Sequence, residues 1–270
     1  MKIKEMLIKG KNTFIIWTII GIAVNVVAML YFKPWGDSLG VAYSPKRLVL
    51  YDIFDWWVMK LPTVLLAASI IASKEFWLAP RGRYQEGKKY PLLNTYGYVA
   101  IAFCAALFTA AGIFNFNLFD LAAAPATLSV TFFHPIIGFF TLWLGGVARS
   151  LVFGTGNPIS NLLGEAISDG GTWIWLGIFY WWFREETKAG KNPVWVIIYW
   201  IVLYIGWRTV YQADEYFWFF PAPAVWARWV WHFTNFLPSG LSVGIPTLIA
   251  VEALIRSAHR GQKGPAPETK

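Results

Sequence analysis

Residues 97–114 read GYVAIAFCAALFTAAGIF, and this uncharged helical stretch decides the class of fold. Alanines at 102, 106 and 110 recur every four residues, so they lie one above another on a single helical face. Inside a bilayer, such a smooth face lets a second helix approach closely. We therefore predict that Ala102, Ala106 and Ala110 dock a partner helix; the alternative is that this face packs only within its own bundle.

The composition of the whole chain indicates a membrane protein. The 270 residues are 57% hydrophobic, 19% aromatic and 14% charged, whereas soluble domains carry roughly 25% charged residues. The 17 tryptophans and 12 tyrosines suit repeated contact with membrane interfaces, because their rings favour the headgroup level. A net charge of +8 would suggest a nucleic-acid partner for a soluble chain, but here loop charge that sets topology explains it. No nucleic-acid partner is expected.

We predict an all-α membrane protein, a polytopic bundle of about eight transmembrane helices, because the chain holds that many long apolar runs. The predicted spans are 13–32, 50–73, 93–113, 127–152, 158–183, 193–212, 223–237 and 240–256. A basic loop at 74–91 suggests three parts: a two-helix N-terminal addition with its cytoplasmic loop (1–91), a six-helix membrane core (92–257) and a disordered cytoplasmic tail (258–270).

Lysines and arginines set the predicted orientation in the plasma membrane. With the N-terminus inside, the basic residues assigned to inner loops outnumber those assigned to outer loops, as the positive-inside rule requires. Both termini are then cytoplasmic. This assignment puts Arg149 and Arg208 at inner helix ends and the 115–126 loop outside.

A polar stripe is the strongest sequence indication of a binding site. Residues spaced by four form it, with an aromatic ring continuing the spacing: Asn157, Asn161, Glu165, Asp169 and Trp173. Lipid does not solvate such a stripe, so it must face a cavity or a partner. The alternative is an amphipathic re-entrant segment at the interface, because Gly170-Gly171 is expected to end one helix near 168 and a new one would begin at Trp173.

The outer loop carries a second candidate set. Its polar residues Asn115, Asn117 and Asp120 lie among the rings of Phe114, Phe116 and Phe119. Rings can stack on a small ring-bearing solute while amides orient it, so the loop is predicted to form a lid. The alternative is an ordinary interfacial loop whose aromatic side chains lie among headgroups.

Charged residues within the spans are expected to pair. Glu252 on the last span could neutralise Arg228 on the seventh, where His232 shares the face of Arg228. Lys60 is expected to reach the interface or to pair within the bundle.

No enzymatic chemistry is predicted. The three histidines and the single cysteine, Cys104, lack metal-ligand spacing. There is no phosphate-binding loop, dinucleotide fingerprint or nucleophile elbow. We expect no catalytic residue, no metal and no cofactor.

In the order of these features, the chain resembles the membrane-embedded substrate-binding subunits (S components) of energy-coupling-factor vitamin transporters. The matching pieces are the Ala102/Ala106/Ala110 face, the 115–126 loop, His134-Pro135-Ile136-Ile137-Gly138 and Gly145/Gly146. The family often has an acidic residue after the last glycine, where this chain has Arg149. The resemblance implies docking of the alanine face on a coupling membrane subunit, a gating loop outside, and two cytoplasmic ATPases that supply energy.

Two functions are therefore considered. The first is a substrate-capture subunit for vitamin or micronutrient uptake that binds its small-molecule solute between the loop and the stripe. Two acids and many rings favour a cationic or neutral heteroaromatic solute. The alternative is a non-catalytic structural or accessory subunit of a larger membrane complex, which the two added N-terminal helices favour and whose polar stripe would be buried against a partner chain.

Overall fold

The computed structural model describes residue 23 and residues 60–72, 94–116, 119–154, 162, 166–212 and 222–262. Most of the helix predicted at 13–32, the basic loop at 74–91 and the tail beyond residue 262 lie outside this part of the chain. The predicted boundary near residue 91 lies outside it as well.

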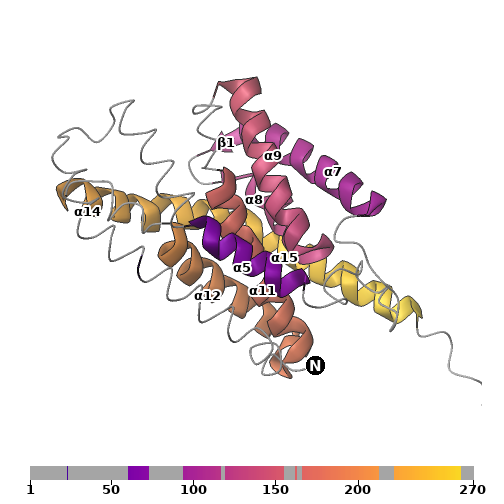
Figure 1. Cartoon of the computed structure of the whole chain (residues 1–270). Coiled ribbons are helices and arrows are strands. Elements are labelled where there is room, and N and C mark those ends of the chain that lie inside the picture. Colours follow the sequence, from indigo (N-terminus) through magenta and orange to yellow (C-terminus); the bar gives the residue numbers. More distant parts are fainter. Residues whose placement is uncertain are drawn as a thin grey trace, which may run out of the picture.

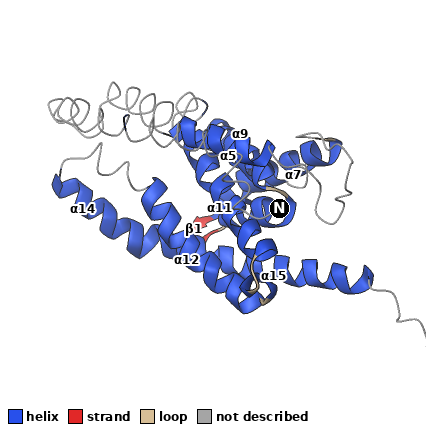
Figure 2. Ribbon diagram, turned by 60° about the horizontal axis from the view of Figure 1, so that its bottom comes forward, coloured by secondary structure: helices blue, strands red, loops and turns tan. Residues whose placement is uncertain are grey.

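The described chain is almost entirely helical, which confirms the predicted all-α class (Figures 1 and 2). Its elements are α5 (Leu61–Ala72), α7 (Thr95–Ala111), η3 (Gly112–Phe114), β1 (Asn115–Phe116), β2 (Phe119–Asp120), α8 (Ala123–Leu128), η4 (Ser129–Phe133), α9 (Pro135–Phe153), α11 (Ala166–Glu186), η6 (Ala189–Lys191), α12 (Pro193–Gln212), α14 (Ala222–Trp231), η7 (His232–Phe236) and α15 (Leu237–Gln262). The strands form one two-residue antiparallel pair.

Helix α9 packs against α7 and α11. Helices α7 and α9 run parallel, because their carboxyl ends meet. Thr109 Oγ1 donates a hydrogen bond to the carbonyl oxygen of Gly145 (3.2 Å), and a methyl group at Gly112 would touch the Arg149 side chain. The sequence had predicted consecutive spans here, which would run antiparallel.

The parallel arrangement arises from a helix break at His134. The predicted loop 115–126 and span 127–152 are wrong in their boundaries: α8 begins at Ala123, η4 is π-helical, and His134 is extended (φ −171°, ψ 147°) before α9. Proline disfavours helical geometry in the preceding residue and suits a helix start. His134 Nδ1 also caps α9 by accepting from the Ile136 N–H (3.2 Å). Segment α8–η4 therefore returns along α7, and the Phe133 ring meets the Tyr96 ring (5.9 Å).

Helix α11 runs antiparallel to α9 and is continuous through its glycines. The alternative in which Gly170-Gly171 ends one helix near 168 is wrong, because α11 is continuous from Ala166 to Glu186. A methyl group at Gly170 would lie 2.8 Å from Phe139 Cδ2 and 3.0 Å from the Phe139 carbonyl oxygen, so glycine permits this close approach. Glycine costs only about 1 kcal/mol in a helix, which packing of this kind can offset.

Residues 222–262 form one uninterrupted helical stretch instead of the two predicted spans at 223–237 and 240–256. The π-helical segment η7 explains how the chain continues past Pro238. There the Leu237 N–H donates to the carbonyl of His232, five residues earlier, and the wider turn accommodates a ring that lacks an N–H.

Among the described residues, two helical segments are long and apolar enough to cross a membrane, Pro135–Phe153 and Trp229–Ser257. Four further apolar helical segments of the described chain are shorter. Large apolar side chains are also exposed on several elements. Val99, Leu151 and Val202 are 63%, 67% and 65% exposed.

The predicted docking face lies on the outside of α7. Ala102, Ala106 and Ala110 are exposed, while Cys104 and Phe108 on the opposite face are buried. Docking of this face on a partner helix stays a prediction, as does the alternative of packing within its own bundle.

Candidate functional site

One end of the bundle holds a partly open cavity of about 520 Å³. Four charged side chains line it: Asp120, Arg149, Asp169 and Arg208. Aromatic rings and small polar groups complete the wall, among them Phe108, Trp173, Trp231, Asn235, Phe236 and Ser239. We call this the Arg208 end of the bundle, where α7, α9 and α12 finish and α8 and α11 begin.

The structure brings together three of the eight residues predicted to bind substrate. Asp120 comes from the loop, and Asp169 and Trp173 come from the stripe. Asn115 pairs with Asp120 in the β1–β2 register, but its side chain is outside the described part. The remaining predicted residues lie outside the described chain: Asn117, Asn157, Asn161 and Glu165.

Local backbone geometry fixes Asp120. Its Oδ1 accepts a hydrogen bond from the Ala122 N–H (3.1 Å), just before α8 begins. A short side chain that bonds two residues ahead stabilises a turn of this kind. The hairpin and the start of α8 thus hold this carboxylate at the cavity wall.

Arg208 lies in an aromatic niche. Its Cζ is 4.7 Å from the ring centre of Phe236, 5.5 Å from that of Tyr204 and 5.6 Å from that of Trp173. The side chain is 6% exposed, and its Nη2 lies 3.9 Å from Asp169 Oδ1. Aromatic faces stabilise a cation through their quadrupoles, so the rings help to hold this charge inside the bundle.

Sequence reasoning missed both arginines as site residues. It counted them as inner loop charge and put the 115–126 loop outside, yet Arg149 and Arg208 share a cavity with Asp120 of that loop. An inner position for the two arginines and an outer position for the loop are therefore incompatible. The available signal was an arginine within an apolar helix, which marks a functional candidate by itself.

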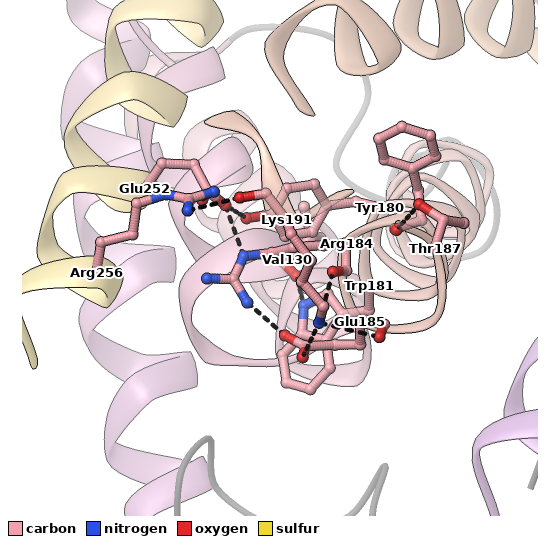
Figure 3. Close-up of polar contacts among 10 residues, drawn as sticks. Val130, Tyr180, Trp181, Arg184, Glu185, Thr187, Lys191, Glu252 and Arg256 are labelled. Carbon is pink, nitrogen blue, oxygen red and sulfur yellow. Dashed lines mark hydrogen bonds and ion pairs between the residues drawn. The ribbon is translucent and has the colours of Figure 1, made fainter. Parts of the chain in front are cut away.

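A buried ionic cluster occupies the other end of the bundle, which we call the Glu252 end (Figure 3). Glu252 accepts from Arg184 Nε (2.8 Å) and from the Tyr180 hydroxyl, and its Oε2 lies 3.2 Å from Arg256 Nη2. Arg256 also donates to the Lys191 carbonyl (2.9 Å). The cluster joins α11, η6 and α15.

This cluster corrects the predicted partner of Glu252. The sequence favoured Arg228, which is on the next span in the predicted order. Because 222–262 is one helical stretch, Arg228 lies 24 positions before Glu252 along it, far beyond the reach of a side chain. Glu252 instead pairs with Arg184, because the side chains of Tyr180 and Arg184 reach from α11 to α15 at this level.

Lys60 is buried at the start of α5 and is 2% exposed, which excludes the expectation that it reaches the interface. It lies close enough to Asp169 to stabilise the negative charge of that carboxylate, as do Arg149 and Arg208. Lys60 therefore adds a third cation near Asp169, beside Arg149 and Arg208.

Among the described residues, no three His, Cys, Asp or Glu side chains gather in a way that could hold a metal ion. Comparison with protein-family models, with curated proteins and with solved structures found no match to this chain. The resemblance to transporter S components therefore remains a prediction from the quoted motifs. Fold and cavity together define a helical protein with a partly open cavity lined by charged and aromatic side chains.

Proposed function

We propose that this chain is a multi-pass membrane protein that captures a small solute in the cavity at the Arg208 end. It would serve a vitamin or micronutrient uptake transporter as the substrate-binding subunit. The observation that carries the proposal is the cavity itself: about 520 Å³, lined by rings and by opposed charges from separate helices. Binding sites for small molecules typically combine an apolar wall with a few convergent polar groups.

The surface of α7 supports the membrane environment. This helix has no charged residue, yet its outer face carries Tyr98, Val99, Phe103 and Leu107, which are all at least 40% exposed. Water would make such a continuous apolar face costly, whereas lipid tails suit it. The two helical segments that are long enough to cross a bilayer support the same environment.

The arrangement of basic residues supports an orientation with the cavity outside. Helix α5 ends and α7 begins toward the Glu252 end, and the basic residues 74–91 lie between these two helices in the sequence. Lys188, Lys191 and Arg256 belong to that end too. By the positive-inside rule the Glu252 end is cytoplasmic. This revision moves Arg149 and Arg208 outward and keeps the 115–126 loop outside and the C-terminus inside.

Cysteine labelling tests this orientation. In a Cys104→Ser background, Phe119→Cys at the Arg208 end should react with a membrane-impermeant maleimide in intact cells. Lys191→Cys should react only after permeabilisation. Both positions are at least half exposed, so access to reagent is comparable. Labelling of both from the same side would contradict the proposed orientation.

The partner assignment follows from the resemblance and from the exposed alanine face. Ala102, Ala106 and Ala110 would dock a coupling membrane subunit, and separate ATPases would supply energy. The same exposed face also favours the second candidate, an accessory subunit of a larger membrane complex. Only the first candidate requires the cavity to hold a solute.

Recovery of a bound compound separates the two candidates. Wild-type protein purified in mild detergent should release a small molecule detectable by mass spectrometry, and Asp169→Ala should lose most of it. Glu185→Ala, an acid at the Glu252 end and 38% exposed, is the matched control and should retain the compound. If wild type releases nothing, and no vitamin raises its melting temperature, the capture function is wrong.

A further inference from the structure

We infer that the solute bound in the cavity carries a carboxylate beside its ring, and that Arg208 binds this carboxylate. The inference deepens the proposed function and rests on it. It replaces the cationic or neutral solute that two acids alone had suggested.

Hydrogen-bond donors of Arg208 remain available in the cavity wall. Among the described residues, no acceptor lies within hydrogen-bond distance of its Nε, which is buried. The ion pair with Asp169 spans 3.9 Å, which is longer than a charge-assisted hydrogen bond. A guanidinium has five N–H donors in a planar fork that matches a carboxylate.

The rings around Arg208 do not take the place of such an acceptor. Tyr204, Trp173 and Phe236 stabilise the charge of the guanidinium but offer ring faces toward it. Ring faces are weak acceptors, so the directional N–H groups still gain from an oxygen partner. A buried cation with incomplete hydrogen bonding is costly, and a ligand carboxylate would reduce that cost.

A second arginine in the wall favours the same solute. Arg149 lines the cavity together with Arg208, Asp120 and Asp169, so a ligand carboxylate held by Arg208 would be attracted by two cations of one cavity. Asp120, held near the start of α8, could then receive an ammonium group, so a zwitterion also fits.

The aromatic wall accounts for the ring of the solute. Trp173, Trp231 and Phe236 come from α11, α14 and η7 and contribute to one cavity wall. Flat aromatic surfaces stack on heteroaromatic or aromatic rings in offset or edge geometry. The class of ligand is therefore a ring-bearing carboxylate, either anionic or zwitterionic.

Four probes that share one ring and differ in charge test this inference. Indole-3-propionate is an anion, tryptophan a zwitterion, tryptamine a cation and indole-3-ethanol neutral. Isothermal titration of wild-type protein in detergent should show the two carboxylates binding roughly 10- to 100-fold more tightly than tryptamine, the ratio expected for a charge-assisted hydrogen-bond pair.

Variants assign the preference to Arg208. Arg208→Gln should abolish the preference for carboxylates, and Arg208→Lys, which keeps the charge but loses the fork, should reduce it. Lys191→Gln removes an exposed cation at the Glu252 end and should change nothing. If Arg208→Gln does not fold, the lysine variant and the wild-type series decide.

The inference is wrong if tryptamine binds as tightly as indole-3-propionate, if both Arg208 variants keep the full preference, or if none of the four binds at millimolar concentration. A co-purified compound without an acidic group would also overturn it, while leaving the capture function in place. No co-purified compound at all counts against the capture function itself.

Discussion

Replacing Glu252 with leucine is expected to lower the free energy of unfolding by about 3 kcal/mol, because it removes the buried carboxylate that pairs with Arg184 and, among the described residues, leaves this buried guanidinium with only the half-exposed Glu185 as a counter-charge. The side chain of Glu252 is 3% exposed and that of Arg184 is 8% exposed. Leucine has a similar size, so the loss reports the missing charge and hydrogen bonds and not an empty space. A denaturing-detergent titration followed by tryptophan fluorescence measures the change.

Glu185 provides the matched control. It contacts the same guanidinium, but its side chain is 38% exposed, so Glu185→Leu should cost less than about 1 kcal/mol. Adding Arg184→Leu to Glu252→Leu should restore part of the stability, since an apolar pair can replace a buried ion pair. A double variant as unstable as the sum of the two single variants would contradict a direct pairing.

Trp200→Ala is expected to be the most damaging truncation in the aromatic centre of the bundle. Trp200 is fully buried and meets the rings of Tyr180 (5.8 Å), Trp173 (6.2 Å) and Tyr204 (6.4 Å). Its removal should cost about 3 kcal/mol, the lower end for such truncations, because within a bilayer the cavity and lost packing dominate over transfer from water.

Trp226→Ala is the comparison for that truncation. Trp226 is also helical but is 75% exposed, so the same deletion should change stability by no more than about 0.5 kcal/mol. Unfolding curves of both variants, measured in one detergent, give the difference. Equal losses would mean that Trp200 is not at the centre of a packed core.

Helices with clear start signals could be predicted closely from the sequence. The predicted span 193–212 coincides with α12, where Asn192 Oδ1 accepts from the Val194 N–H (2.9 Å) before Pro193 begins the helix. The prediction 93–113 is within two residues of α7 at each end, and Asn94 caps that helix in the same way through the Gly97 N–H (2.9 Å). Caps are local, so one short stretch of sequence contains the information.

Breaks and continuations depended on tertiary packing and were harder to predict. His134-Pro135 divides a uniformly apolar run, and hydropathy is the same on both sides of it. The predicted spans 223–237 and 240–256 form one helical stretch, because the π-helical segment η7 carries the chain past Pro238. Gly170 had seemed to be a helix breaker but is a contact point with Phe139.

The site residues also differ in how far the sequence predicts them. Asp169 stood out as part of a polar stripe in an apolar span, and Asp120 stood out as a polar residue among the rings of the outer loop. Arg208 did not, because an arginine near a predicted helix end is also explained by topology. Only the parallel course of α7 and α9 and the fold of α12 onto α11 bring the arginines and the acids to one end of the bundle.

The most direct test of solute capture is a crystal structure of the wild-type protein with its co-purified compound. We predict continuous ligand density in the cavity, with a carboxylate within hydrogen-bond distance of Arg208 and a ring against Trp173 or Phe236. Ligand density elsewhere on the protein, with this cavity containing only water, would contradict the assignment of the site.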